Sequence, residues 1–118
     1  MVKIEALAEA ALQHQSLRLR SLAQELLQTD LPLTSISRPQ TEDPRLLALA
    51  AGLLELLALH TNQAAPTWTD EIGGSPEPFF LLQAALRMKR LRDLCERESP
   101  EPLRKRNLYA QPDFLSFA

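Results

Sequence analysis

The chain has few of the residues that build disulfide-bonded or metal-bound folds. It has one cysteine, Cys95, and two histidines, His14 and His60, among 118 residues. A single thiol excludes an intrachain disulfide and a zinc site with four thiolate ligands. Neither histidine has a carboxylate three or four residues away, the spacing at which metal ligands share one side of a helix. We therefore expect no bound metal.

Catalytic signatures are also missing. The sequence has no GxSxG or SxxK motif, and the adjacent pair Gly73-Gly74 is too short to cradle a nucleotide. Glu55 lies within an apolar stretch, where a lone acid is better explained by a surface position or by an ion pair with an arginine than by catalysis. We expect neither an enzyme nor a cofactor.

Targeting and membrane-spanning segments are not evident either. The most apolar run, 46–59, contains Glu55 and is shorter than the roughly 20 residues that cross a bilayer. Glu5 and Glu9 interrupt the beginning of the chain where a secretory signal needs an apolar stretch. These features predict a cytoplasmic protein with no membrane span.

What the sequence does contain is leucine and alanine at helical spacing. The pattern predicts one long helix over 2–28, a second from Asp43-Pro44 to about residue 60, and a third over 76–98. Ser99-Pro100 predicts a short fourth helix to about residue 106. The fold class is therefore all-α, a single domain over 1–118 with three main helices, the short fourth helix and an aromatic C-terminal tail. Residues 1–61 form a leucine-rich helical pair, and 62–118 are rich in proline, aromatic residues and arginine.

The predicted helix over 44–60 is apolar on most of its sides. Three or four helices of one chain would struggle to cover it, so we expect a helical bundle completed by oligomerisation. A like subunit and a different protein both satisfy this requirement, and the sequence does not choose between them.

Charge divides the chain unevenly around a net value of -2. Residues 1–86 hold five basic and ten acidic side chains, whereas 87–106 hold eight basic and four acidic ones. Cations on the helix over 76–98 can follow phosphates, but pairs such as Lys89 with Asp93 and Arg92 with Glu96 can also neutralise that helix by themselves. The run 104–106 suits phosphate, an acidic protein surface or the negative end of its own helix.

All aromatic side chains lie from residue 68 onwards, where they can close the core or form an interface. Phe114 and Phe117, on a tail that needs an anchor to stay ordered, are the stronger interface candidates. The predicted partner-binding residues are Trp68, Phe79, Phe80, Arg87, Arg90, Arg104, Arg106, Tyr109, Phe114 and Phe117.

Two segments resemble a known group of proteins. PTWTDEIGGSPEPFF at 66–80 and LRDLCERESPEPLRKRNLYAQPDFL at 91–115 are similar to the C-terminal half of small uncharacterised bacterial proteins, notably cyanobacterial ones. Similar short helical proteins are often encoded beside nucleotidyltransferase-fold proteins in pairs that look like toxin and antitoxin. The resemblance implies an antitoxin-like protein and a nucleotidyltransferase-fold partner. It does not extend to 1–61 and carries no catalytic residue.

These observations favour a non-enzymatic interaction protein that binds and occludes another protein. Two alternatives remain open at this point: a small dimeric nucleic-acid-binding regulator, and a homo-oligomeric structural protein. The first predicts a steep dependence of binding on salt concentration.

Overall fold

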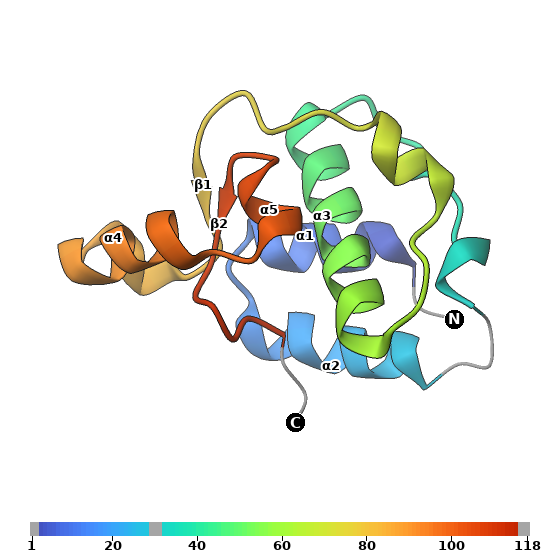
Figure 1. The fold of residues 1–118 in the computed structure, drawn as a ribbon, viewed down its shortest axis with the longest axis horizontal. Helices are drawn as coiled ribbons and strands as arrows, with labels where there is room; N and C mark the ends of the chain where they lie inside the picture. Colours follow the sequence, from blue (N-terminus) through green and yellow to red (C-terminus); the bar gives the residue numbers. More distant parts are fainter. Residues whose placement is uncertain (1–2, 29–31, 116–118) are drawn as a thin grey trace.

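The computed structural model describes residues 3–28 and 32–115, and this part of the chain is mostly helical (Figure 1). The all-α class is thus confirmed in outline, although a two-stranded sheet is present. The helices are α1 Ile4–Leu12, α2 Ser16–Leu27, α3 Pro44–Thr61, α4 Lys89–Glu98 and α5 Glu101–Arg104. The short elements are η1 Leu33–Ser35, η2 Thr67–Glu71, β1 Phe79–Phe80, η3 Gln83–Leu86 and β2 Leu108–Tyr109.

Helix α3 is the centre of the core, and its start is the one that the sequence predicts. The Asp43 carboxylate accepts from the backbone N–H of Arg45 at 3.0 Å, and Pro44 takes the first helical position. Asn62 ends the helix in the left-handed conformation, with a φ of 56°. Between residues 47 and 58, every side chain except Glu55 is buried.

That burial is provided by the same chain. Helix α1 packs against one side of α3, while α5 and η2 pack against others (Figure 1). The reason given by the sequence for a second subunit therefore no longer holds, because α3 is already covered. Oligomerisation itself stays a prediction.

Helix α3 is also long and apolar enough, by length and composition, to cross a membrane, and it is the one helix of this kind among the described residues. Most of its length is buried against the rest of the chain here, as expected for the core helix of a globular fold.

The single helix predicted over 2–28 is wrong, because the chain breaks between α1 and α2. His14 has a φ of 57°, a left-handed conformation that no helix interior contains. Its ring stacks on Phe79 with centroids 5.3 Å apart, and its Nε2 donates to the carbonyl oxygen of Phe80 at 2.8 Å. A contact with β1 therefore accompanies the break and holds the turn.

The helix predicted over 76–98 forms only in its second half. Ser75, the residue before the predicted helix, does not cap it: its hydroxyl donates to the carbonyl of Glu77 at 2.7 Å, and its backbone N–H donates to the carbonyl of Arg106 at 2.8 Å. The segment then forms β1, which pairs in parallel with β2 in the register Phe79 with Leu108 and Phe80 with Tyr109. The sequence assigned one of these strands to a helix and the other to a tail.

Helix α5 is shorter than predicted, and Ser99 has a different role from the expected cap. The Ser99 hydroxyl donates to the carbonyl of Leu108 at 3.3 Å and accepts from the N–H of Ala110 at 3.1 Å. It therefore joins the end of α4 to β2. After β2, Phe114 and Leu115 are buried in the core, so the chain is anchored by its own interior up to the end of the described region.

The loop before β1 runs directly over the backbone that follows α5. A Cβ at Gly74 would lie 3.0 Å from both the backbone carbon and the oxygen of Arg106, whereas a Cβ at Gly73 would meet nothing within 4 Å. Neither glycine has a positive φ. A side chain at position 74 would therefore press on the backbone of Arg106, whereas one at position 73 has free space.

We expect Gly74→Ala to lower the free energy of unfolding by about 1–3 kcal/mol, because backbone atoms cannot yield as a side chain does. Gly73→Ala is the matched control, and we expect it to be neutral or stabilising by about 0.4–1 kcal/mol through loss of unfolded-state entropy. Urea unfolding of both variants measures the difference. Equal effects would show that the loop does not approach Arg106 as described.

Candidate interaction surface

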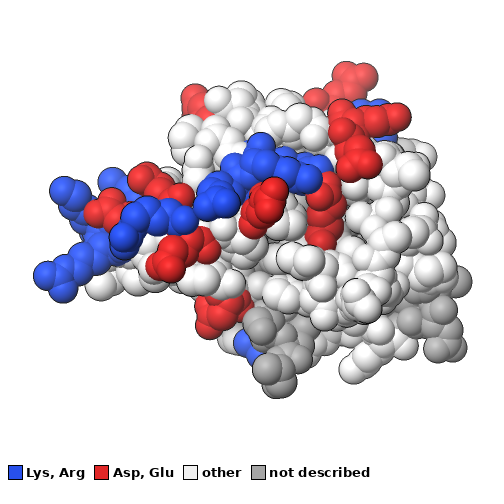
Figure 2. Space-filling model, viewed as in Figure 1, with Lys and Arg blue, Asp and Glu red and all other residues white. Residues whose placement is uncertain are grey.

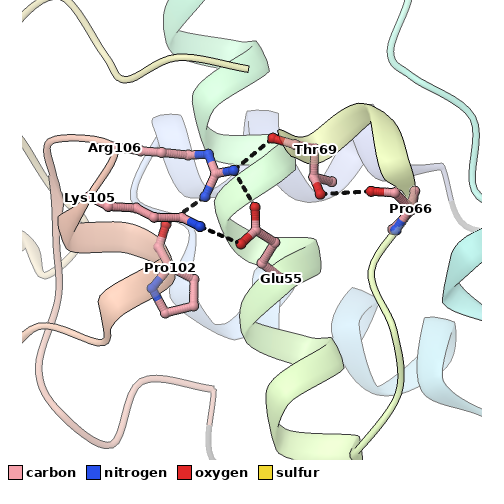
Figure 3. A network of polar contacts seen from close by, with 6 residues as sticks. All are labelled: Glu55, Pro66, Thr69, Pro102, Lys105 and Arg106. Atoms are coloured by element: carbon pink, nitrogen blue, oxygen red, sulfur yellow. Dashed lines mark hydrogen bonds and ion pairs between the residues drawn. The ribbon is translucent and has the colours of Figure 1, made fainter. Parts of the chain in front are cut away.

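An ionic cluster with a buried arginine ties α3, η2 and α5 together (Figure 3). Nη2 of Arg106 donates to Oε1 of Glu55 and, at 2.7 Å, to the carbonyl of Thr69. Nη1 of the same guanidinium donates to the carbonyl of Pro102 at 3.0 Å. Nζ of Lys105 lies 2.9 Å from the other carboxylate oxygen of Glu55. We call Glu55, Lys105 and Arg106 the Glu55 cluster.

This geometry removes Arg106 from the predicted partner-binding set, because the residue is only 3% exposed and its charge is used inside the chain. Of the two explanations offered for Glu55, a surface position or an ion pair with an arginine, the structure shows the ion pair. Burial raises the pKa of Glu55, but the hydrogen bonds and positive charges of Lys105 and Arg106 together lower it by more, so it lies below the ordinary value of 4.5. The carboxylate is therefore ionised at neutral pH and holds two cations.

The predicted aromatic contacts are divided between the core and the sheet. Phe114 is buried in the core, which corrects its assignment as an interface anchor. Trp68 is half-buried and donates from Nε1 to the carbonyl of Ile36 at 2.8 Å, which fixes the loop before α3. Phe117 lies outside the described residues.

The other aromatic candidates flank the small sheet. Phe79 stacks on His14, and the rings of Phe80 and Tyr109 are 5.4 Å apart. The Tyr109 hydroxyl donates to Oδ1 of Asn107 at 3.1 Å. All three rings are half-buried. They hold segments together that are far apart in the sequence.

Residues 83–98, comprising η3 and α4, project from the rest of the molecule, and we call them the arm (Figure 1). Helix α4 packs mainly against η3 rather than against α3. Cys95 is buried at its inner side, where burial and the neighbouring Glu96 raise the pKa of the thiol. Leu86 and Met88, in the turn between η3 and α4, are 50% and 55% exposed.

Arg92 fastens the two parts of the arm to each other. Its Nε donates to the carbonyl of Ala85 at 3.1 Å, and its Nη2 donates to the carbonyl of Leu86 at 2.8 Å. One planar guanidinium thus holds two consecutive carbonyls of η3 against α4. Sequence reasoning grouped Arg92 with the surface cations and missed this role, because its partners are backbone atoms that leave no side-chain signal.

The expected self-neutralisation of α4 does not occur. No ion pair joins Lys89 to Asp93, Arg92 to Glu96 or Asp93 to Arg97, and all of residues 89–98 are described. Arg87 and Arg90 are exposed and form no ion pair with any described residue. Arg87 and Arg90 are therefore available to a partner.

Arginines continue from the arm onto α5. Arg97 follows Arg90 by two helical turns, and Nη1 of Arg104 donates to the carbonyl of Arg97 at 3.2 Å. We call Arg90, Arg97, Arg104 and Lys105 the basic track. Figure 2 shows Lys and Arg side chains in a band from the projecting end of the molecule to the middle of this face, with acidic side chains beside it.

A shallow hollow of about 400 Å³ opens on the arm at η3 and the turn that follows it, lined by Gln83, Ala84, Arg87 and Met88. It brings Arg87, an exposed arginine of the predicted set, next to the exposed side chain of Met88. Elsewhere in the described part of the chain, no group of three His, Cys, Asp or Glu residues is arranged to hold a metal ion.

Comparison with known proteins found no matching family model, no similar curated protein and no similar solved structure. The resemblance to small cyanobacterial proteins therefore stays a prediction. The surface features of the arm are the remaining basis for assigning a function.

The Glu55 cluster gives a pH-dependent prediction. Because the folded-state pKa of Glu55 is lowered, its contribution to stability is complete above 4.5 and is lost as the pH falls through the folded-state value. We expect Glu55→Gln to lower the free energy of unfolding by about 3 kcal/mol at neutral pH, since it leaves Arg106 buried without a counter-charge.

The difference in stability between the wild type and Glu55→Gln should shrink as the pH is lowered below 4.5, and denaturant unfolding across this range measures it. Glu25→Gln, at an exposed position on α2, is the control and should change stability little at any pH. A difference that does not vary with pH would contradict the electrostatic role of the cluster.

Proposed function

We propose that this chain is a non-enzymatic protein-interaction module whose arm binds an acidic surface of another protein and thereby occludes it. The observation that carries the proposal is the exposure of Leu86 and Met88 beside Arg87 and Arg90, on an element that packs outside the core.

The residue types at the arm are those that supply binding energy in protein interfaces. Apolar side chains that lose contact with water contribute affinity, and arginine is enriched where interfaces are strongest. Exposed cations without ion-pair partners steer an acidic partner towards the site and fix its orientation. Leu86 and Met88 are 50% and 55% exposed, so a partner that covers them would bury further apolar surface.

The partner implied by the sequence resemblance is a nucleotidyltransferase-fold protein, and the chain would act on it as an antitoxin-like inhibitor. Occlusion by surface complementarity requires no catalytic group on this chain. A protein of that fold encoded beside this one is the first partner to test.

A small nucleic-acid-binding regulator is the second candidate, and the basic track supports it. Successive arginines can follow phosphates and release counterions. Nucleic-acid binding explains the arginines but gives no role to Leu86 and Met88, since a phosphate backbone provides no apolar contact. Protein binding accounts for both features.

Affinity capture of the tagged protein from its host, with nuclease present, tests the proposal. We expect one protein to be recovered in stoichiometric amount by the wild type. The double variant Arg87→Glu with Arg90→Glu should recover it with affinity lowered at least about tenfold, because like charges then face each other.

The control is Arg18→Glu with Arg38→Glu, which makes the same change of charge at exposed positions away from the arm. It should retain the partner, and both double variants should melt at the wild-type temperature. Equal loss of binding in the two variants would contradict a role for the arm. Material that is lost only after nuclease treatment would identify the nucleic-acid function instead.

A further inference from the structure

We infer that the hollow on η3 receives one apolar side chain of the partner protein, and that Arg87 binds a carboxylate carried by a residue next to that side chain. The ligand is thus a short acidic segment with a single apolar anchor. The inference rests on the proposed function and adds the chemistry of what the arm recognises.

The lining of the hollow combines an apolar wall with two polar edges. Ala84 and the exposed side chain of Met88 provide the wall, and Gln83 and Arg87 complete the lining of its volume of about 400 Å³. All four residues belong to η3 and the turn after it. A lining this short surrounds one side chain rather than a row of them. Burial of a single anchor against Met88 removes apolar surface of both proteins from water.

The polar groups of the lining are free to bind this segment. Arg87 is exposed and forms no ion pair, and the Gln83 amide makes no hydrogen bond, with any described residue. A guanidinium binds a carboxylate through two parallel hydrogen bonds, and an amide can donate to and accept from a peptide backbone. Because Arg87 and Met88 line the same hollow, the carboxylate has to lie within about one residue of the apolar anchor.

The charge around the hollow favours an acidic segment. Residues 83–92 hold four basic side chains and no acidic one, whereas 1–82 hold five basic and ten acidic ones. Of these four, only Arg87 lines the hollow. Lys89 and Arg90 are exposed nearby in the chain and make the surrounding potential more positive. An acidic segment is therefore attracted to this part of the arm, and a basic one is repelled.

Hydrogen bonds within the arm fix the shape of the hollow before the partner arrives. The carbonyl of Ala84 accepts from the backbone N–H groups of both Arg87 and Met88, at 3.1 and 2.9 Å. The two carbonyls that Arg92 binds lie between these residues in the chain. A lining that is already ordered lowers the entropy lost on binding.

Two synthetic peptides of identical composition test the inference, and fluorescence anisotropy measures their affinity. In the adjacent peptide, a leucine has a glutamate on each side within a glycine and serine background. In the separated peptide, the same glutamates lie about five residues from the leucine, beyond the reach of one side chain. We expect the adjacent peptide to bind at least about tenfold more tightly, because only it places a carboxylate at Arg87 while its leucine occupies the hollow.

Two variants separate the apolar from the ionic contribution. Ala84→Leu fills the hollow with the protein's own side chain, and we expect it to weaken binding of the adjacent peptide severalfold without changing the dependence of affinity on salt concentration. Arg87→Glu should abolish the preference for the adjacent peptide. Arg18→Glu makes the same change of charge at an exposed position on α2 and should keep the full preference. Melting curves followed by circular dichroism verify that all three variants fold.

Equal affinity of the two peptides, including no measurable binding of either, would overturn the inference, and so would unchanged binding by a folded Ala84→Leu variant. The proposed function would survive either result if capture of the partner still depends on Arg87 and Arg90. Capture that is also insensitive to those arginines, or tighter binding of a single-stranded oligonucleotide than of the adjacent peptide, would overturn both.

Discussion

The ion pair between Arg106 and Glu55 is the interaction on which the arrangement of the C-terminal half depends. The guanidinium is buried and also bonds the carbonyls of Thr69 and Pro102, so it holds η2 and α5 against α3 at once. Removing water from two charges is costly, and the cost is met only while every partner is in place. The chain after α5 then runs on from this fixed point into β2, which pairs with β1.

Contacts within the fold determine which basic side chains remain free to bind a partner. Arg106 is buried and both of its Nη atoms bond within the fold, and Lys105 shares Glu55 while staying partly exposed. Arg92 is directed to backbone carbonyls of η3. Arg87 and Arg90 are left facing water, so the basic segment that looks uniform in the sequence separates into structural and surface residues.

The sequence correctly predicted features that are set by neighbouring residues. It failed for features that are set by contacts between residues far apart in the chain. Asp43-Pro44 defines the start of α3 because the cap and the proline act within two residues. The break at His14 was not predictable, since its partner Phe80 is 66 positions away. Helix propensity over 76–88 is overridden by pairing with β2, although Pro76 and Pro78 were a local signal against a helix there.

The candidate site was predicted in part for the same reason. Arg87, Arg90 and Arg104 are exposed, as a binding role requires, whereas Arg106 carries the same local signal and is buried. A surface position and an ion pair with an arginine were both open for Glu55, and the sequence could not choose because the partner Arg106 lies 51 positions further along the chain. Leu86 and Met88 are exposed because they lie in the turn before α4. The apolar spacing of the sequence predicted a continuous helix there and gave no sign of this turn.

Native-state hydrogen exchange tests most directly whether the arm is an element separate from the core held by the Glu55 cluster. We predict that amides of α4 exchange by local opening at a lower free energy than those of α3, and that Glu55→Gln lowers protection in α3 and β2 but not in α4. Protection in α4 equal to that in α3, and lost together with it in the variant, would contradict this account.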